Sequence, residues 1–187
     1  MTVLRITGGY LAGRTISSLP GENTRPPLTR VRESVANILR PYIEEAVVLD
    51  LFAGTGSFSF ELLSRGAQFA VLIDKSPKAV QVLRKNAAKL DVEDMVEIIR
   101  ADALQMIDRF KRAGNRFDII IVAPPYFTGL DQETMTRLGS GELLSPGGIV
   151  LLQQSRKETF NEKYGDLILK KTYRYGETRI STYILDE

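Results

Sequence analysis

From residue 46 onwards, short and continuously apolar runs alternate with longer stretches in which apolar residues recur every three or four positions. This alternation predicts strands and helices joined by right-handed crossovers, in a mainly parallel sheet with both faces covered. The predicted strands are Ala46–Phe52, Phe69–Asp74, Met95–Arg100, Phe117–Val122 and Gly148–Gln153. The predicted helices are Phe58–Arg65, one that begins at Ser76-Pro77, Ala103–Arg112 and Leu130–Leu144.

The start of the chain departs from this alternation. Val3–Thr7 and Arg14–Ser18 predict a hairpin, and a Pro- and Gly-rich stretch follows as far as Pro27. Thr29 is predicted to cap a helix that Pro41 ends, because proline lacks the N–H that a helix interior needs. We therefore predict an N-terminal extension of hairpin and helix over residues 1–41.

The end of the chain departs from it as well. Asp166–Thr172 and Arg179–Leu185 predict two strands joined by the short link Tyr175-Gly-Glu-Thr178, which favours an antiparallel hairpin. Residues 42–187 then form a second region, in which an antiparallel hairpin closes a parallel sheet. This ending distinguishes the chain from a plain dinucleotide-binding domain.

Charge is concentrated in the N-terminal extension. The net charge is +2, but residues 1–40 hold six arginines against two glutamates, and residues 41–155 are net acidic. A solvated charged surface would not by itself favour arginine, whereas bidentate phosphate contacts and base stacking do. The segment therefore favours contact with nucleic acid. The candidate contacts are Arg5, Arg14, Arg25, Arg30 and Arg32.

The chain has no cysteine and no histidine. Disulfides, a thiol nucleophile, a Ser-His-Asp triad and the usual zinc sites are thereby excluded. No apolar run reaches the ~20 residues that cross a bilayer. We expect a cytoplasmic protein that works without a metal ion, as a monomer.

The most informative segment runs from Val47 to Ser57, where an apolar strand leads through Gly54 and Gly56 directly into a helix. Glycines let the backbone turn tightly and approach a ligand, and in open parallel sheets ligands bind beyond the carboxyl ends of the strands. Asp74 ends the next strand, twenty residues after Gly54, a spacing at which an acidic side chain can hold ribose hydroxyls.

NAD is the obvious rival ligand for such a loop, but Ser59 stands where its fingerprint needs a third glycine. Asp50 suits a ligand with an ammonium group better than a pyrophosphate. Asp102 follows a third strand, where a carboxylate could accept from an adenine amine. Each aspartate alone could equally be a helix cap or turn residue, but together the three favour S-adenosylmethionine, which carries an ammonium and a sulfonium and no phosphate.

Ala123, Pro124, Pro125 and Tyr126 follow the fourth predicted strand. Two prolines force an extended, rigid backbone with free carbonyls, and the aromatic ring offers a stacking surface for a base. A stiff turn beside a core tyrosine is the plainer interpretation. Because the segment should lie opposite the Gly54 loop, we take it as the candidate catalytic site.

The pattern Asp50-x-Phe-x-Gly-x-Gly56, with Pro-Pro-Tyr after the fourth strand, resembles the amino-group methyltransferases of nucleic acids. Arg5-Ile-Thr-Gly-Gly-Tyr-Leu-Ala-Gly-Arg14, Arg25-Pro and Arg30-Val-Arg-Glu-Ser34 narrow the resemblance to the RsmD family, which methylates guanine N2 in small-subunit (16S) ribosomal RNA. It spans nearly the whole chain, including the terminal hairpin.

The resemblance implies a fold and a cofactor. The fold is a class I, Rossmann-like α/β methyltransferase with a seven-stranded, mostly parallel sheet and an antiparallel last strand. S-adenosylmethionine would lie with its ribose at Asp74, its adenine at Asp102 and the Ala103 amide, and its methionine end at the loop from Asp50 to Gly56. The candidate cofactor-binding residues are Asp50, Phe52, Ala53, Gly54, Gly56, Asp74, Lys75, Asp102 and Ala103.

Ala123 departs from the family pattern, which has Asp or Asn at this position. A guanine amine is a poor nucleophile, and an acceptor for its hydrogens helps to free its lone pair. The carbonyl of Pro124 could still accept one bond. Three functions stay open: guanine-N2 methylation of ribosomal RNA in a small-subunit particle, a protein that binds RNA and cofactor without turnover, and methylation of another amine such as adenine N6 or a protein side chain.

Overall fold

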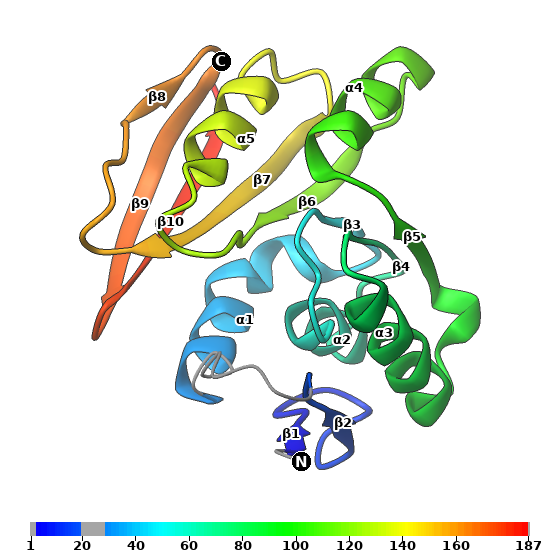
Figure 1. The fold of residues 1–187 in the computed structure, drawn as a ribbon. Helices are drawn as coiled ribbons and strands as arrows, with labels where there is room; N and C mark the ends of the chain where they lie inside the picture. Colours follow the sequence, from blue (N-terminus) through cyan, green and yellow to red (C-terminus); the bar gives the residue numbers. More distant parts are fainter. Residues whose placement is uncertain (1–2, 20–28, 187) are drawn as a thin grey trace.

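A computed structural model of the protein describes residues 3–19 and 29–186. Its main sheet is built from β3 (Val47–Asp50), β4 (Phe69–Asp74), β5 (Val96–Arg100), β6 (Phe117–Val122), β7 (Leu144–Ser155), β8 (Lys163–Tyr164), β9 (Leu167–Tyr175) and β10 (Thr178–Leu185). These strands lie in the order β5-β4-β3-β6-β7-β10-β9-β8 (Figure 1). The first five pair in parallel, and β10 pairs antiparallel with both β7 and β9. The predicted α/β methyltransferase topology is confirmed, with the two-residue strand β8 added at one edge.

Helices cover both faces of the sheet (Figure 1). On one face lie α1 (Thr29–Ile43), α2 (Ser57–Ser64) and α3 (Pro77–Leu90), and on the other lie α4 (Ala103–Ala113) and α5 (Leu130–Leu138); the short 3₁₀ turn η1 (Glu93–Met95) precedes β5. Successive strand residues face opposite sides, so the sheet contributes to two cores. Ile119 and Ile121 join the first helical layer, and Ile120 and Val122 join the second.

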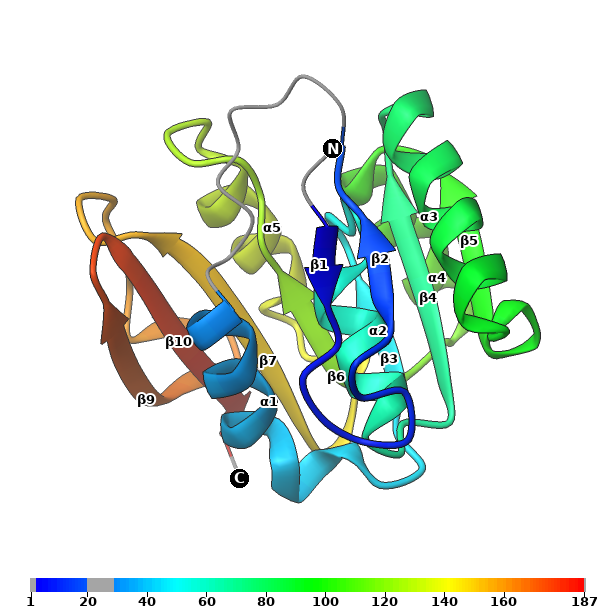
Figure 2. The ribbon, with the colours of Figure 1, turned by 90° about the horizontal axis from the view of Figure 1, so that it is seen from below.

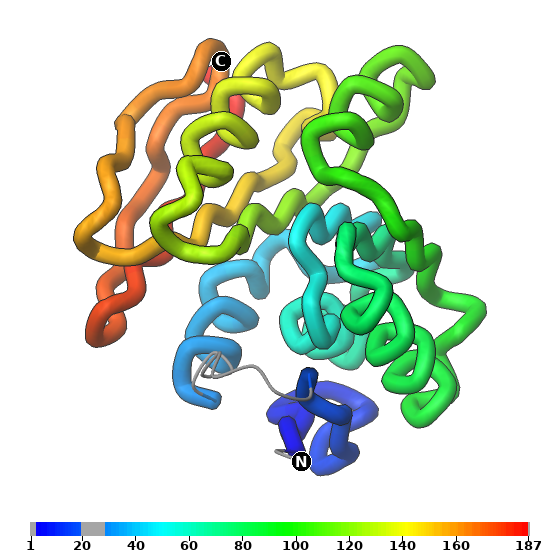
Figure 3. Tube along the Cα trace, viewed as in Figure 1, coloured from blue at the N-terminus to red at the C-terminus, as the bar shows by residue number. Residues whose placement is uncertain are grey.

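A separate two-stranded hairpin, β1 (Val3–Arg5) and β2 (Thr15–Ser17), lies outside α2 and α3 (Figure 2). Its residues Leu4, Ile6 and Ile16 are buried in the same cluster as α1 and α2. Every residue of α2 is buried as a result. The N-terminal segment thus shares the core of the sheet, and the chain runs from it to β10 on the opposite side of the molecule (Figure 3).

Two predicted helix ends are wrong. The first helix continues through Pro41 to Ile43. Proline there removes a single backbone donor from the last turn, and the burial of Ile43 offsets that loss. The fifth helix ends at Leu138 instead of Leu144, because Gly141 takes a left-handed conformation (φ 70°) and the chain turns early into β7. Among the described residues, no helix is long and apolar enough to cross a membrane.

Candidate active site

The carboxyl ends of β4, β3, β6 and β7 meet at one edge of the sheet, because these strands are neighbours and parallel. Asp50 pairs with Leu72 on one side and Ile121 on the other. The glycine loop after β3 and the Pro-Pro-Tyr segment after β6 therefore leave the sheet side by side. This is the edge at which parallel α/β sheets bind their ligands.

Asp74 locks the glycine loop to the end of β4. Its Oδ2 accepts from the Gly54 N–H at 2.9 Å, and its Oδ1 accepts from the Ser76 N–H at 2.8 Å. Both glycines of the loop have positive φ, yet their surroundings differ. A Cβ on Gly56 would lie 2.3 Å from the ring of Phe60, whereas a Cβ on Gly54 would meet no atom within 4 Å. Gly56 thus lets the loop pack on α2, and Gly54 borders open space in which a ligand fits.

Asp50 is a buried carboxylate with one oxygen unused. The Ser59 hydroxyl donates to Oδ2 at 2.7 Å, while Oδ1 is shielded from water and has no hydrogen-bond partner among the residues that the structure describes. Burial raises the pKa of Asp50 to about 7. A buried carboxylate oxygen without a partner is costly unless a cation or donor reaches it. The site therefore fits the ammonium group of S-adenosylmethionine.

Asp102 is the N-cap of α4, where its Oδ1 accepts from the Leu104 and Gln105 N–H groups at 3.0 and 3.2 Å. Helix capping, the alternative role that the sequence left open for this aspartate, therefore explains its position without a ligand. Ala103 is the first residue of α4 and is buried, and Lys75 is exposed beyond β4. Phe52 and Ala53 follow β3, half-buried and buried respectively.

The Pro-Pro-Tyr segment runs outwards from the end of β6, with Pro124 buried, Pro125 exposed and Tyr126 half-buried. The Tyr126 hydroxyl lies 3.0 Å from Oγ1 of Thr178, the first residue of β10. Burial raises the pKa of Tyr126, and hydrogen bonds with Thr178 and Gln153 oppose that rise. The terminal hairpin thus reaches into the site and holds the aromatic ring of the Pro-Pro-Tyr segment.

Phe127 is an exposed aromatic residue next to this ring. It is 67% exposed, and its φ of 60° is an outlier for a bulky side chain. Its ring meets Tyr126 edge-to-face, with the centroids 6.4 Å apart. The Glu158 carboxylate holds the strained backbone by accepting from the Phe127 N–H at 2.5 Å.

The sequence prediction missed Thr178, Gln153, Phe127 and Glu158. Gln153 carried a usable signal, because a polar residue at the end of an apolar strand is what singled out Asp50. Phe127 directly follows Tyr126 in the chain, whereas Thr178 and Glu158 reach the site only through the pairing of β10 and the loop after β7, which the sequence pattern does not specify.

Two of the predicted RNA-contacting arginines serve the fold of the N-terminal hairpin. Arg32 is buried and donates to the Arg5 carbonyl at 2.7 Å. Burial lowers the pKa of Arg32, although the Glu61 and Glu33 carboxylates oppose this. Arg5 is exposed and donates to the Gly13 carbonyl at 2.8 Å. As folded, Arg32 presents no surface to an RNA.

The other three arginines that the sequence predicts to contact RNA differ in exposure and in their contacts. Arg14 donates to the Leu90 carbonyl at 3.0 Å and pairs with Asp91 at 2.9 Å, which fastens the hairpin to the end of α3. Arg30 is exposed in the first turn of α1. Arg25 lies outside the described residues.

Glu61 fastens the hairpin to the helix that follows the glycine loop. Its buried carboxylate accepts from the Thr7 N–H (2.9 Å), the Thr7 hydroxyl (2.6 Å), the Gly8 N–H (2.9 Å) and Arg65 Nε (2.9 Å). Four donors on one carboxylate explain how a buried charge is tolerated in α2.

Asn86 of α3 makes a second link from the hairpin, and this one ends on the glycine loop itself. Its Oδ1 accepts from the Ser17 N–H at 2.8 Å, and its Nδ2 donates to the carbonyls of Ser17 (3.1 Å) and Thr55 (2.9 Å). The glycine loop is therefore braced by the N-terminal segment.

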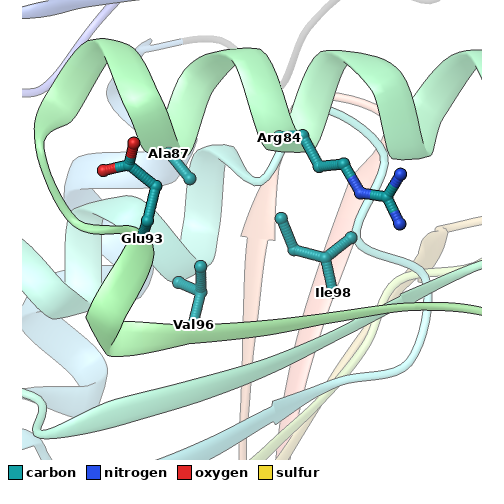
Figure 4. A pocket seen from close by; sticks show the side chains of 5 residues that line it. All are labelled: Arg84, Ala87, Glu93, Val96 and Ile98. Carbon is teal, nitrogen blue, oxygen red and sulfur yellow. The ribbon is translucent and has the colours of Figure 1, made fainter.

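A hollow elsewhere on the surface lies between α3 and β5, lined by Arg84, Ala87, Glu93, Val96 and Ile98 (Figure 4). Val96 begins β5, so the hollow lies towards the amino ends of the strands, away from the site just described. Among the described residues no three His, Cys, Asp or Glu side chains gather as a metal site.

The fold is that of the class I S-adenosylmethionine-dependent methyltransferases. The 16S rRNA N2 methyltransferase RsmC of Thermus thermophilus, solved with AdoMet and guanosine, matches 99% of this chain and 50% of its own with a TM-score of 0.76. The two sequences are 22% identical, so this comparison shows the fold alone.

The sequence comparisons place the chain within that class. The family model described as Conserved hypothetical protein 95 matches residues 4–184. The ribosomal RNA small subunit methyltransferase D of Buchnera aphidicola is 34% identical over 180 residues, which cover 96% of this chain and 88% of that protein. The structure of Escherichia coli yhhF matches 99% of both chains at 28% identity, with a TM-score of 0.87. The chain belongs to the RsmD family, as its motifs predicted.

Proposed function

We propose that this protein transfers the methyl group of S-adenosylmethionine to the exocyclic N2 amine of a guanine in small-subunit ribosomal RNA. One observation carries the proposal. Asp50 lies at the end of β3 with its Oδ1 buried and without a partner in the described part of the chain, and the Pro-Pro-Tyr segment leaves the adjacent strand β6. A site for a cationic ligand and a site for a planar base thus lie next to each other.

On the cofactor side, Asp50 holds the ammonium group, the Gly54 loop borders the methionine end, and Asp74 holds the ribose. Asp102 and the Ala103 amide hold the adenine. When bound, the cofactor supplies an electrophilic methyl group on its sulfonium. The protein contributes position, and alignment of two reactants at ~3–3.5 Å is a large share of catalysis.

On the base side, the target guanine must leave its stack to reach the sheet edge. Tyr126 supplies the stacking surface, and its hydroxyl is already fixed by Thr178 at 3.0 Å. The Pro124 carbonyl can accept one hydrogen of the base amine. Proline rigidity keeps these groups in place without a conformational change of the backbone.

The RNA-binding part of the proposal concerns residues 1–41. Arg30 and Arg25 remain candidates for phosphate contacts, and Arg5 keeps an exposed side chain. The extension braces the cofactor loop through Asn86, so we treat residues 1–41 as an RNA-contacting extension that packs on the catalytic domain of residues 42–187. The protein would act as a cytoplasmic monomer on small-subunit particles, and relatives named for small-subunit ribosomal RNA methylation support this substrate.

The test uses small subunits from cells that lack this methylation, incubated with the protein and methyl-labelled S-adenosylmethionine. We expect label in N2-methylguanosine after digestion to nucleosides, and faster labelling by Ala123→Asp. Label in another nucleoside or in ribosomal protein would assign a different amine. Cofactor binding without any transfer by either protein would overturn the proposal and leave a binding function.

A further inference from the structure

Ala123 leaves the amine-binding position without a side-chain acceptor. The lone pair of a guanine N2 amine is delocalised into the ring, and an acceptor bonded to an amine hydrogen localises it for attack. Ala123 is partly buried against the first core, and its methyl group cannot accept a hydrogen bond. If the protein methylates guanine, a second acceptor besides the Pro124 carbonyl has to come from a neighbouring element.

The register of β6 and β7 identifies that neighbour. Ile121 pairs with Leu151 and Val122 with Leu152 in parallel, so the same register, continued by one residue, sets Ala123, which follows β6, beside Gln153 of β7. Side chains alternate between faces along a strand. Ala123 and Gln153 therefore share the face of Ile121 and Leu151, which is the face of α2 and the glycine loop.

Gln153 has an acceptor that no described residue uses. Its Oε1 is shielded from water, and within residues 3–19 and 29–186 no donor reaches it. Gln153 opposes the rise in the pKa of Tyr126, as a donor beside the hydroxyl does, so the nitrogen side of its amide borders the stacking surface. A buried acceptor left without a partner lowers the stability of the fold. An amine that donates to Oε1 satisfies this buried acceptor and displaces no hydrogen bond from it.

We propose that the Gln153 Oε1 accepts a hydrogen bond from the target amine and so replaces the missing side-chain acceptor at position 123. This inference rests on the proposed function. Gln153 is then a catalytic residue, since it touches the reacting nitrogen, and Tyr126 positions its amide.

The chemistry balances without a protein base. The N2 lone pair forms the new nitrogen–carbon bond while the carbon–sulfur bond breaks and its electron pair stays on sulfur. The nitrogen becomes positively charged and loses one proton to water. The neutral Gln153 amide bonds to the second hydrogen throughout and takes up no proton, because an amide oxygen is a weak base.

The experiment measures single-turnover methyl transfer to small subunits at saturating cofactor. We compare the wild type, Gln153→Leu, Gln153→Glu, Ala123→Asn and the double variant Ala123→Asn/Gln153→Leu. We expect Gln153→Leu to slow transfer about 100-fold, as the loss of one preorganised hydrogen-bonding group commonly does. Gln153→Glu keeps an acceptor and should stay within about threefold of the wild type above the pKa of the new carboxyl, with a rate that falls below it.

The double variant separates chemistry from folding. When the asparagine introduced by Ala123→Asn supplies the acceptor, the loss of Gln153 should cost less than about tenfold, because both groups serve the same amine hydrogen. Cofactor affinity and the thermal midpoint are measured for every variant, so that a loss of transfer caused by unfolding or by loss of the cofactor is recognised.

Three results would overturn the inference. Gln153→Leu could retain full transfer, it could lose the same factor in both backgrounds, or the wild type could be inactive while Ala123→Asn is active. In the first two cases guanine methylation by this protein still stands, whereas in the third the wild type lacks the proposed function as well. If no variant transfers methyl to guanine, the proposed function itself fails.

Discussion

The two halves of the site differ in charge. The cofactor half brings the carboxylates of Asp50, Asp74 and Asp102 to the ends of three strands or the helix that follows. The base half, at β6, β7 and β10, offers the neutral groups of Tyr126, Gln153 and Thr178. A carboxylate-rich surface suits a cationic cofactor, and neutral hydrogen-bonding groups suit an uncharged base. The polarity of each half thus matches the ligand that we assign to it.

The halves are also braced differently. The N-terminal hairpin holds the glycine loop from outside. Asn86 bonds to the loop itself, and Glu61 links the hairpin to α2, the helix that follows the loop. The Pro-Pro-Tyr segment is held from the C-terminal side, where Glu158 binds the Phe127 N–H and Arg179 donates to the Glu158 carbonyl at 3.1 Å. Substitutions in one half should therefore leave ligand binding in the other half intact.

The largest effect is expected when Asp50 loses its charge. Asp50→Asn should weaken S-adenosylmethionine binding by about 10²–10⁴, since removal of one partner from a buried ion pair costs about 3–5 kcal/mol. Calorimetric titration measures this. The unliganded variant should be at least as stable as the wild type, because a buried carboxylate is removed; an unchanged cofactor affinity would contradict our assignment of this half.

The same group sets a pH dependence of stability. The pKa of Asp50 rises from 3.8 to about 7 on folding, so between these pH values the folded chain keeps a proton that the unfolded chain releases. Asp50 should therefore make the unliganded wild type less stable as pH rises through this window, and the Asp50→Asn protein should lack that contribution. Urea unfolding of both proteins across this pH range measures the difference.

Removal of the stacking ring should affect only the base half. Tyr126→Ala should raise the KM for the ribosomal substrate about 10–100-fold, as loss of one base–aromatic stack does, and leave cofactor affinity unchanged. Tyr126→Phe is the matched control, because it keeps the ring and loses only the hydrogen bonds of the hydroxyl; we expect a change of about tenfold at most. A parallel loss of cofactor affinity in Tyr126→Ala would mean that the halves are not independent.

A smaller effect should appear in the pH dependence of cofactor binding. Because the pKa of Asp50 is about 7, its carboxylate is mostly protonated at pH 6.0 and mostly ionised at pH 7.5. S-adenosylmethionine should therefore bind roughly eightfold more weakly at pH 6.0. Titrations of the protein with S-adenosylmethionine at the two pH values test this. The affinity of the Asp50→Asn protein should be the same at both pH values.

The smallest effect concerns the strained backbone of the base half. Phe127→Asn should stabilise the protein by about 0.5–1 kcal/mol, because asparagine tolerates positive φ and the phenyl ring is largely exposed. Phe127→Val is the opposite control and should destabilise it, since a β-branched residue resists this conformation. Urea unfolding of the two variants distinguishes them, and a loss of stability in both would show that the ring itself stabilises the fold.

The amino-acid sequence alone predicts the strands from β3 to β7, the glycine loop and the Pro-Pro-Tyr segment. Each is encoded locally: apolar runs predict buried strands, Gly54 and Gly56 permit positive φ, and consecutive prolines fix an extended backbone. The parallel order follows from the alternation of strands with helices, and so does the shared edge at which Asp50 and Tyr126 meet.

Which polar groups are free depends on how the whole chain packs. Burial by neighbouring elements raises the pKa of Asp50, Arg14 bonds to the end of α3, and Arg32 bonds to the hairpin, although the charge pattern predicts RNA contact for both arginines. The register of β6 and β7 sets Gln153 beside Ala123, thirty residues away in the chain. Burial and register depend on packing between residues that are far apart in the sequence. Composition and periodicity describe local segments and do not specify these contacts, so the free polar groups of the site can be identified only in the folded chain.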